Sequence, residues 1–469
     1  MSDRDERFSS ERMEAIERRF DDQGRFFRSG ATLPRAVREE HLRGLISAVE
    51  RFESRILEAS YADLRRNEVE ARASEVDVVI SEAKLALRKL KTWMRARRSL
   101  PPLMSWPGLG SSRMWPMGRN LIVSPWNYPF LLTVAPLVSC IAAGNVAILK
   151  PSEISSASAD IIAELVRSTF SPDLVDVFLG GVDVSQALLG LPFDHIFFTG
   201  SPRVGKIVAR AAAEHLTRVT LELGGKSPAL VMPSADLDVA ARRIALGKFF
   251  NTGQSCVAPD YVLAHQAVHD ELLSRLERTI EAFFGADPER SPDYGRIVND
   301  GHFERLVALV DPDRVVCGGT WDASERYIAP TLLSGVELDD QVMQEEIFGP
   351  LLPVLRVDDR DAAIEIMRRL PPPLALYLFT DDSEDERVLM QAVPFGGGCV
   401  NTTLLHFIDS SLPFGGVGNS GQGASHGEHG FRTFSHPQGI MQAGTFIDPK
   451  LRYPPYTPRK KAWIRRLMG

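Results

Sequence analysis

One of the four cysteines, Cys256, lies in a segment that suits a reactive thiol. It follows the run NTGQS at 251–255, which comes directly after a predicted helix at 237–250. Because Gly253 is a natural helix terminator, we expect Cys256 on an accessible turn. A thiol nucleophile needs such access together with a lowered pKa. No histidine is evident nearby, which disfavours a cysteine–histidine pair of the protease type.

A covalent thiol mechanism also needs an acid–base group and a donor for a developing oxyanion. Glu222 ends the predicted strand VTLEL, and active sites of α/β proteins lie at such strand ends. The glycine pair at 224–225 allows other segments to approach it. Asn127 is an amide in the apolar run PWNYP, so it is either a member of a hydrogen-bond network or an oxyanion donor.

Three glycine patterns compete as phosphate-binding sites. Residues 416–421 match GxGxxG, but no strand precedes them and no helix follows, so we interpret them as a tight loop. Residues 200–206 match the front of a P-loop, but Ile207 stands where a P-loop needs the hydroxyl of Ser or Thr. An ATPase site is therefore disfavoured.

The segment at 200–206 still fits a phosphate site of another kind. It lies between a predicted strand at 193–199 and a predicted helix at 203–216, whose first N–H groups can meet a pyrophosphate. Gly200 allows close approach, and Ser201 either caps the helix or donates to a phosphate. Upstream, Lys150 and Glu153 follow the strand NVAIL and suit ribose hydroxyls, although on local grounds such a pair is more typical of a solvated loop.

Composition limits the class of protein that positions these residues. The chain has 469 residues, 44% hydrophobic and 25% charged, which excludes collagen-like, coiled-coil and largely disordered proteins. The net charge of −7 gives no electrostatic footprint for nucleic acid. The cysteines form no CxxC pair, so a disulfide framework and a structural metal site are disfavoured, and we expect a reducing, cytoplasmic compartment.

Short β-rich runs alternate with helical stretches from residue 121 onward, which predicts βαβ units and a parallel sheet. The uncharged segment at 120–149 is long enough to span a bilayer, but its prolines favour two buried strands that flank a loop and a short buried helix. The first hundred residues are predicted to be helical, with one amphipathic helix at 68–97 that buries Val69 among its apolar residues and stops before Pro101 and Pro102.

Seven motifs occur in the order that is seen in the aldehyde dehydrogenase superfamily. They are PWNYP (125–129), KPSE (150–153), FTGS with Gly205 (198–205), LELGGKSP (221–228), NTGQSCVAPDYV (251–262), EEIFGP (345–350) and LPFGGVGNSGQG (412–423). The chain resembles that superfamily from about residue 10 to residue 456. Within it, CVAPDYV, LALYLF and HGEHGFRTFSHP resemble the class 3 group, and LPFDHIFFTG and NTTLLH resemble the bacterial coniferyl-aldehyde dehydrogenases.

This resemblance implies roles for the residues described above. Cys256 is expected to attack the aldehyde carbon, while the Asn127 amide and the Cys256 backbone N–H hold the oxyanion. Oxidation by the nicotinamide then leaves a thioester, and Glu222 activates the water that hydrolyses it to a carboxylic acid. A CoA-acylating relative or a thioesterase and a non-catalytic protein stay as alternatives, and the presence of Glu222, which acylating relatives usually lack, speaks against the first.

The resemblance also implies the cofactor site. The residues expected there are Trp126, Lys150, Glu153, Gly200, Ser201, Gly205, Glu346 and Phe348. A carboxylate at Glu153 repels a 2′-phosphate, so NAD is favoured and NADP is the alternative. No metal is expected. The substrate is expected to be an aromatic or cinnamyl aldehyde such as coniferaldehyde, with long-chain aliphatic aldehydes as the alternative, in a tunnel lined by Tyr128, His406 and Phe407.

The implied fold is α/β and aldehyde dehydrogenase-like. We expect an NAD(P)-binding Rossmann-type domain at 1–97 and 117–223, and a catalytic domain at 224–425. A small oligomerisation β-element and the C-terminal tail are expected at 98–116 and 426–469. The short N-terminal section favours a homodimer. The basic tail is too short to span a membrane, and a weak contact with a membrane surface is the most it is expected to make.

Overall fold

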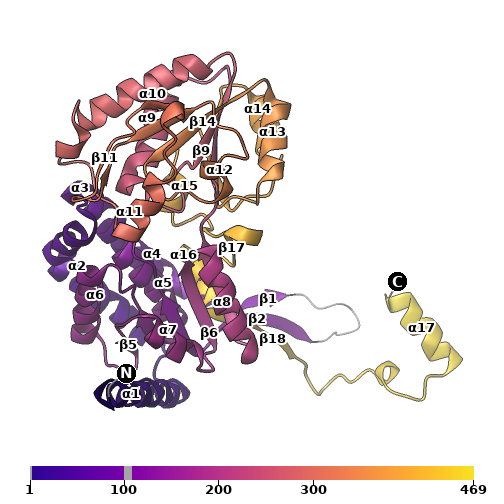
Figure 1. The fold of residues 1–469 in the computed structure, drawn as a ribbon. Coiled ribbons are helices and arrows are strands. Elements are labelled where there is room, and N and C mark those ends of the chain that lie inside the picture. The colour runs from indigo at the N-terminus through magenta and orange to yellow at the C-terminus, as the bar shows by residue number, and fades with distance from the viewer. Residues whose placement is uncertain (1–2, 100–107, 469) are drawn as a thin grey trace.

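Two mainly parallel β-sheets organise the computed structural model, which describes residues 3–99 and 108–468 (Figure 1). Each sheet forms the centre of an α/β lobe, and the two lobes are stacked on each other. A three-stranded arm projects sideways from the lobe that contains the N-terminus. The predicted parallel-sheet organisation is confirmed, and all six β-rich runs from LIVSP to PALVM are strands.

The first sheet has the order β17-β7-β6-β3-β4-β5. Its strands are β3 (Arg119–Val123), β4 (Val146–Lys150), β5 (Val175–Val177), β6 (His195–Gly200), β7 (Arg218–Leu223) and β17 (Gly421–Gln422). The short β17 pairs antiparallel with β7, and the other pairs are parallel. The chain leaves β3 toward β4 and β5 and later returns to place β6 on the other side of β3. The carboxyl ends of β3 and β6 therefore form a topological switch point, where α/β sheets bind ligands.

Helices connect the strands of the first sheet and cover its faces. They are α5 (Pro129–Ala143), α6 (Ser156–Thr169), α7 (Val182–Leu189) and α8 (Pro202–Glu214). The uncharged segment at 120–149 forms β3, α5 and β4 and is almost entirely buried, so the interpretation of this segment as core is confirmed. Within the described part of the chain, no helix combines the length and the apolar composition that crossing a bilayer requires.

Four N-terminal helices pack beside this sheet. They are α1 (Asp3–Arg28), α2 (Arg35–Leu64), α3 (Glu68–Ala71) and α4 (Asp77–Trp93). The helix predicted at 68–97 is confirmed as continuous helical structure from Glu68 to Trp93, but its end at 97 is wrong, and a π-helical turn at Arg72–Val76 lies between α3 and α4. The wider turn shifts the helical phase, so Val69 is 78% exposed while Val76 and Val79 are buried. The predicted stop at Pro101 and Pro102 lies outside the described residues.

The second sheet has the order β10-β13-β14-β9-β8-β15-β16. Its strands are β8 (Pro228–Val231), β9 (Tyr261–His265), β10 (Val315–Cys317), β13 (Thr331–Ser334), β14 (Leu351–Val357), β15 (Ala375–Phe379) and β16 (Gly397–Val400). The helices of this lobe are α9 (Leu237–Phe249), α10 (His269–Phe284), α11 (Asp300–Val307), α12 (Gln341–Gln344), α13 (Arg360–Arg369), α14 (Ser383–Leu389) and α15 (Leu405–Ile408), with a small hairpin of β11 (Trp321–Asp322) and β12 (Tyr327–Ile328).

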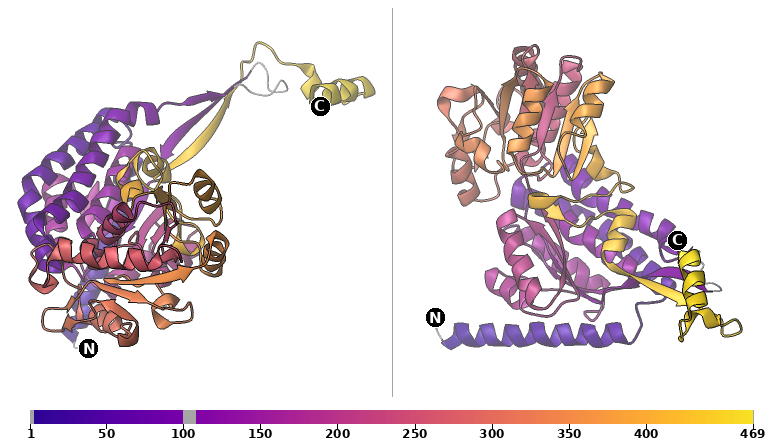
Figure 2. Two further views of the ribbon diagram at one scale, coloured as in Figure 1. Left: turned by 90° about the horizontal axis from the view of Figure 1, so that it is seen from above. Right: turned by 90° about the vertical axis from the view of Figure 1, so that its right-hand side faces the viewer.

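The arm consists of β1 (Arg97–Ser99), β2 (Leu109–Pro116) and β18 (Ser435–Gln442) in an antiparallel sheet. Helix α16 (Gly427–Thr433) leads into β18, and α17 (Pro458–Met468) ends the chain. Figure 2 shows α1 lying along one side of the first lobe and α17 standing off from both lobes beyond the arm. The arm therefore joins segments that are more than three hundred residues apart in the sequence.

Candidate active site

A cavity of about 230 Å³ is lined by residues of both lobes, and it brings Cys256 and Glu222 together. Most of its wall is apolar. Its aromatic lining residues are Tyr128, Phe197, Phe250, Phe407, Phe414 and Phe434. The structure thus places the two residues expected to do covalent and acid–base chemistry at one cavity with a mainly apolar wall, where electrostatic interactions are stronger than in water.

Cys256 lies on a turn, as predicted, and it is half-buried. Helix α9 ends at Phe249, and the chain then reverses through three successive left-handed residues, Asn251, Thr252 and Gly253, with φ of 51°, 57° and 73°. A β-carbon at Gly253 would collide with the backbone carbonyl of Gly349, so only glycine fits there. The local sequence therefore holds the thiol in the cavity by a strained but well-determined loop.

Burial raises the pKa of the Cys256 thiol, and the carboxylates of Glu346 and Glu222 raise it further. The lowered pKa that a resting thiolate requires is therefore not found. The thiol keeps its proton at rest, and the reaction needs an acceptor for that proton in the same cavity.

Glu222 is a buried carboxyl group with one free oxygen. It lies on β7, and its Oε1 accepts a hydrogen bond of 3.2 Å from the Ser425 hydroxyl. Its Oε2 is buried and has no partner among the described residues. Burial raises the pKa of Glu222 well above its ordinary value, opposed by the Ser425 hydrogen bond. A carboxyl group in this state suits proton transfer near neutral pH.

Asn127 follows β3 at the switch point and is buried. Its Nδ2 donates to the backbone carbonyl of Gln254 at 3.1 Å, two residues before Cys256. It does not line the cavity itself. An amide nitrogen carries two donors, so the second is available for an oxyanion. These hydrogen bonds make Asn127 a network member, and its role as an oxyanion donor stays a prediction.

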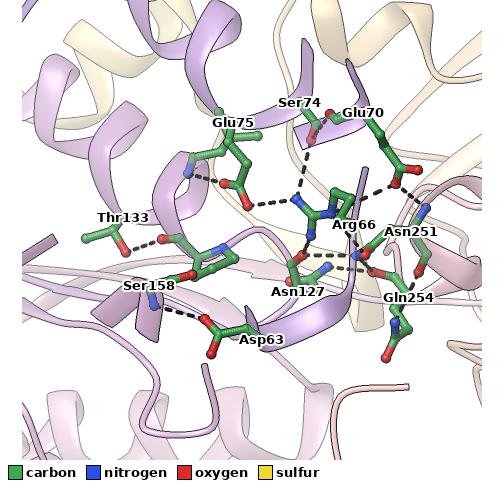
Figure 3. A network of polar contacts seen from close by, with 12 residues as sticks. Asp63, Arg66, Glu70, Ser74, Glu75, Asn127, Thr133, Ser158, Asn251 and Gln254 are labelled. Carbon is green, nitrogen blue, oxygen red and sulfur yellow. Dashed lines mark hydrogen bonds and ion pairs between the residues drawn. The ribbon is translucent and has the colours of Figure 1, made fainter. Parts of the chain in front are cut away.

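A buried ion-pair network fixes this asparagine to the thiol loop (Figure 3). The Arg66 guanidinium donates to the backbone carbonyl of Asn127, to Glu75 at 2.8 Å and to the Asn251 Oδ1 at 3.2 Å. Asn251 in turn donates to the carbonyl of Asn127 at 3.0 Å and to that of Gln254 at 3.1 Å. Arg66 thus connects the segment after β3 with the loop that carries Cys256.

The sequence analysis did not identify Arg66 or Glu75. One signal was present, because Glu75 and Glu82 stand three or four residues from Val79, on the apolar face of the predicted helix. A charge at a buried helical position needs a partner, and here the partners are Arg66 and His426.

The carboxyl edge of the first sheet holds the residues expected at the adenosine end of a cofactor. Lys150 is buried at the end of β4, and its Nζ donates to the Glu153 carboxylate and to the Pro151 carbonyl, each at 2.9 Å. Gly200 ends β6, and Ser201 caps α8 by accepting a hydrogen bond from the Val204 N–H at 3.4 Å. The predicted order of strand, turn and helix is confirmed here.

Glu346, Phe348 and Trp126 meet at the boundary between the lobes. The rings of Trp126 and Phe348 lie edge to face with centroids 5.3 Å apart. The Glu346 carboxylate occupies the space that a side chain at Gly224 would fill. Its Oε1 is buried without a partner among the described residues, and burial, followed by the nearby Asp260, raises its pKa to about 8. An unpaired buried carboxylate oxygen of this kind fits a ribose hydroxyl.

Two of the three residues predicted to line a substrate tunnel do so. Tyr128 and Phe407 line the cavity, but the prediction is wrong for His406. Neighbouring residues of α15 point in different directions, and His406 is turned into the second lobe, where its Nδ1 lies 3.4 Å from the Sγ of Cys399. In the described ranges, no group of three or more His, Cys, Asp or Glu side chains is arranged to hold a metal ion.

Comparison with known proteins gives consistent matches across the chain. The model of the aldehyde dehydrogenase family matches residues 7–440. The 4,4′-diaponeurosporen-aldehyde dehydrogenase of Staphylococcus aureus is 45% identical, covering 96% of this chain and 98% of that protein. The mouse aldehyde dehydrogenase described as dimeric and NADP-preferring is 43% identical, covering 92% and 95%. A substrate-bound structure of S. aureus AldH superposes with a TM-score of 0.95 at 44% identity, covering 97% and 99%.

Proposed function

We propose a substrate class for this chain, which belongs to the aldehyde dehydrogenase family and is an NAD(P)-dependent oxidoreductase that converts an aldehyde to a carboxylic acid. Its proposed substrates are apolar aldehydes of the aromatic or cinnamyl type, such as coniferaldehyde. The observation that carries this proposal is the cavity in which Cys256 and Glu222 face an apolar, aromatic wall. Such a wall binds a ring and excludes bulk water.

In the proposed reaction the Cys256 sulfur attacks the aldehyde carbon as its proton passes to a base. Glu222 is the base that lines the same cavity and has a free oxygen. The Cys256 backbone N–H and the free N–H of Asn127 stabilise the oxyanion of the thiohemiacetal. After oxidation the carbonyl carbon is held as a thioester on Cys256. Glu222 passes the Cys256 proton to solvent and then takes a proton from water, which attacks the thioester. That second proton goes to the departing sulfur, so the acid and the Cys256 thiol are released.

The residues at the carboxyl edge fit a dinucleotide. We propose that Lys150 and Glu153 bind the adenosine ribose, that Gly200, Ser201 and Gly205 bind the pyrophosphate, and that Glu346, Phe348 and Trp126 bind the nicotinamide end. When bound, the nicotinamide supplies the oxidation by accepting a hydride. The half-exposed Glu153 carboxylate disfavours a 2′-phosphate, so we propose a preference for NAD over NADP, unlike the relative described as NADP-preferring.

A long-chain aliphatic aldehyde is the second candidate substrate. The apolar wall that suits a ring also suits an alkyl chain, and the similar S. aureus protein is named for 4,4′-diaponeurosporen-aldehyde. The kcat/KM values for coniferaldehyde, benzaldehyde and dodecanal decide between the two classes. A higher value for dodecanal than for both aromatic aldehydes would overturn the aromatic preference.

Appearance of reduced nicotinamide when the protein, an aldehyde and NAD are mixed without CoA tests the reaction type. Turnover without CoA excludes the acylating alternative, because an acylating enzyme stops at the thioester. Cys256→Ala is the matched control, since it removes the sulfur and leaves the cavity wall intact.

We further propose that the chain has a cofactor-binding domain at 1–97 and 117–223 and a catalytic domain at 224–425. The arm and the C-terminal tail form the remaining element at 98–116 and 426–469, and we propose that the arm joins two copies of the chain. The supporting observations are the separate sheets and the projecting β1, β2 and β18, and one similar protein is described as dimeric. Light scattering on the full chain and on a chain ending after Gln442 tests the assembly.

The exposed Trp463 beside Lys461 and Arg466 supports weak contact of α17 with anionic lipid, which sedimentation with vesicles tests.

A further inference from the structure

Two ionisable side chains line the cavity without a part in the proposed reaction, and they contact each other. Glu82 of α4 is 3% exposed and His426, just before α16, is 8% exposed. The His426 Nδ1 lies 2.7 Å from the Glu82 Oε1. The second Glu82 oxygen accepts a hydrogen bond of 3.1 Å from the Gly427 N–H. A buried pair of this kind costs desolvation energy, and apolar residues of similar size would avoid it.

The orientation of the His426 ring is determined from three sides. Glu82 holds Nδ1, and the rings of Phe407 and Phe414 lie edge-on with centroids at 5.1 and 5.4 Å. The backbone of His426 has φ of 69°, a conformation that a residue with a side chain adopts only under constraint. His426 directly follows Ser425, the residue that contacts the Glu222 carboxyl. The ring is therefore held on the same wall as the acid–base group.

The other ring nitrogen of His426, Nε2, has no hydrogen-bond partner among the described residues, and His426 lines the cavity. The hydrogen bond with Glu82 leaves Nε2 as the available polar atom of the pair. An unpaired polar atom beside an apolar cavity favours ligands that supply its missing hydrogen bond.

The chemistry of the Glu82–His426 pair determines which ligand group can bind the His426 Nε2. Nε2 accepts a hydrogen bond when the ring is neutral and donates one when it is charged, and a hydroxyl group satisfies both states. A carboxylate is disfavoured, because the Glu82 carboxylate lies behind the ring and the described lining includes no lysine or arginine. An ammonium group is disfavoured too, because both Glu82 oxygens already accept hydrogen bonds.

We propose that His426, positioned by Glu82, binds a hydroxyl group on the body of the substrate, so that the cavity prefers hydroxylated aromatic aldehydes over their unhydroxylated counterparts. This inference rests on the proposed function and narrows its substrate class. Glu82 acts through His426 and is a positioning residue. A hydroxyl that leaves Nε2 satisfied is expected to raise kcat/KM by about 10- to 100-fold.

Two matched pairs of aldehydes test the inference, because the hydroxyl must reach His426 while the carbonyl carbon is at Cys256. The pairs are 4-hydroxybenzaldehyde with benzaldehyde, and coniferaldehyde with 3-methoxycinnamaldehyde. The measured quantity is the ratio of kcat/KM within each pair. In the unmodified protein at least one ratio is expected to exceed ten, and in His426→Phe that ratio is expected to fall toward one.

Two further variants separate a positioning role from a structural one. Glu82→Gln keeps an acceptor for the Nδ1–H and is expected to retain most of the ratio, whereas Glu82→Leu removes the acceptor and is expected to lose it. Ser139→Ala removes another hydroxyl from the cavity wall and is expected to leave the ratio unchanged. Equal ratios in the unmodified protein and in His426→Phe would overturn the inference.

Binding measurements keep this inference separate from the reaction type. Calorimetric titration of Cys256→Ser with each aldehyde reports recognition without turnover. Tighter binding of the hydroxylated partner by about tenfold, lost in the double variant with His426→Phe, supports the inference even if the unmodified protein oxidises no aldehyde, a result that would overturn the proposed function alone. Equal binding of both partners overturns the inference.

Discussion

Two groups of buried charges surround Cys256, and they are built in opposite ways. Around Arg66, the guanidinium contacts Glu75, Asn251 and the carbonyl of Asn127, so that its charge is shared among several acceptors (Figure 3). The carboxyls of Glu222 and Glu346, by contrast, each have a buried oxygen without a partner among the described residues.

The difference separates residues that hold the site from residues that we propose react or bind ligand in it. A saturated network has one arrangement and keeps the Asn127 segment and the thiol loop in register. An unsaturated carboxyl is costly to bury, and that cost raises its pKa and leaves an oxygen free for a proton or a ligand. Removing a member of the first group should therefore damage folding, and removing a member of the second should damage chemistry.

The largest expected effect is that of Glu222→Gln. The amide keeps the shape of the side chain but cannot take a proton from water, so we expect steady-state kcat to fall by about 100- to 10,000-fold. A burst of reduced cofactor stoichiometric with the enzyme is expected to remain but to form more slowly, because Glu222 also accepts the Cys256 proton in the proposed reaction, and the thermal midpoint is not expected to fall. Rapid-mixing absorbance measures the burst, and calorimetry measures the thermal midpoint. Full steady-state activity would show that another group is the base.

Arg66→Met is expected to lower the stability of the folded protein, in contrast to Glu222→Gln, which is expected to lower kcat. The Arg66 substitution leaves the buried Glu75 carboxylate without its charge partner, and breaking a buried pair in this way costs about 3–5 kcal/mol of unfolding free energy. Urea denaturation measures this loss. The double variant Arg66→Met with Glu75→Met removes both charges and is expected to recover part of it. If the single variant were as stable as the unmodified protein, the Arg66 network would not stabilise the fold around the site.

The pH dependence of stability gives a smaller effect. Burial raises the pKa of Glu346 to about 8, so the folded protein holds this proton at pH values where the unfolded chain has lost it. Stability then falls as pH rises from about 4.5 to about 8, with a slope of at most about 1.4 kcal/mol per pH unit from this group. Unfolding free energies of the cofactor-free protein at pH 5.5, 6.5 and 7.5 should show a shallower slope for Glu346→Gln. Identical slopes would contradict the assignment.

The smallest effect is expected at the half-exposed end of the cofactor site. Glu153→Gln removes the repulsion toward a 2′-phosphate and weakens the ion pair with Lys150. Since exposed charge pairs contribute about 0–1 kcal/mol, we expect kcat/KM for NADP to rise up to about fivefold relative to NAD. Asp160→Asn on α6, another exposed carboxylate, is the control and should leave the ratio unchanged. A fall in the ratio for Glu153→Gln would contradict the electrostatic argument.

The sequence was sufficient for the six strands from β3 to β8, because buried parallel strands are short apolar runs bounded by glycine and proline. It was not sufficient for the π-helical turn at Arg72–Val76, since nothing in a local pattern shows where a helix will widen by one residue. Val69 was therefore assigned to the wrong face. The short β17 was missed for a related reason, because a two-residue strand has no periodicity to detect.

For the site, motifs identified the residues that the chemistry uses but not the residues that hold them. Cys256 and Glu222 stand in distinctive local sequences, and the structure places both at one cavity. Arg66 stands among other charged residues of a helical region and has no distinctive local signal, and only the fold brings its partners Asn127 and Asn251 to it. His426 and Glu82 are 344 residues apart, and only the fold brings them together.

The position of β17 also determines when this molecule can become active during its synthesis. Residues 421–426 provide the strand beside Glu222, the Ser425 hydroxyl and the His426 ring, although they come near the end of a chain of 469 residues. A nascent chain that has folded its first sheet on the ribosome still has β7 as an open edge strand. A polypeptide that terminates after residue 256 but before residue 421 therefore carries the thiol and the carboxylate but has neither a closed cavity nor a protected sheet edge.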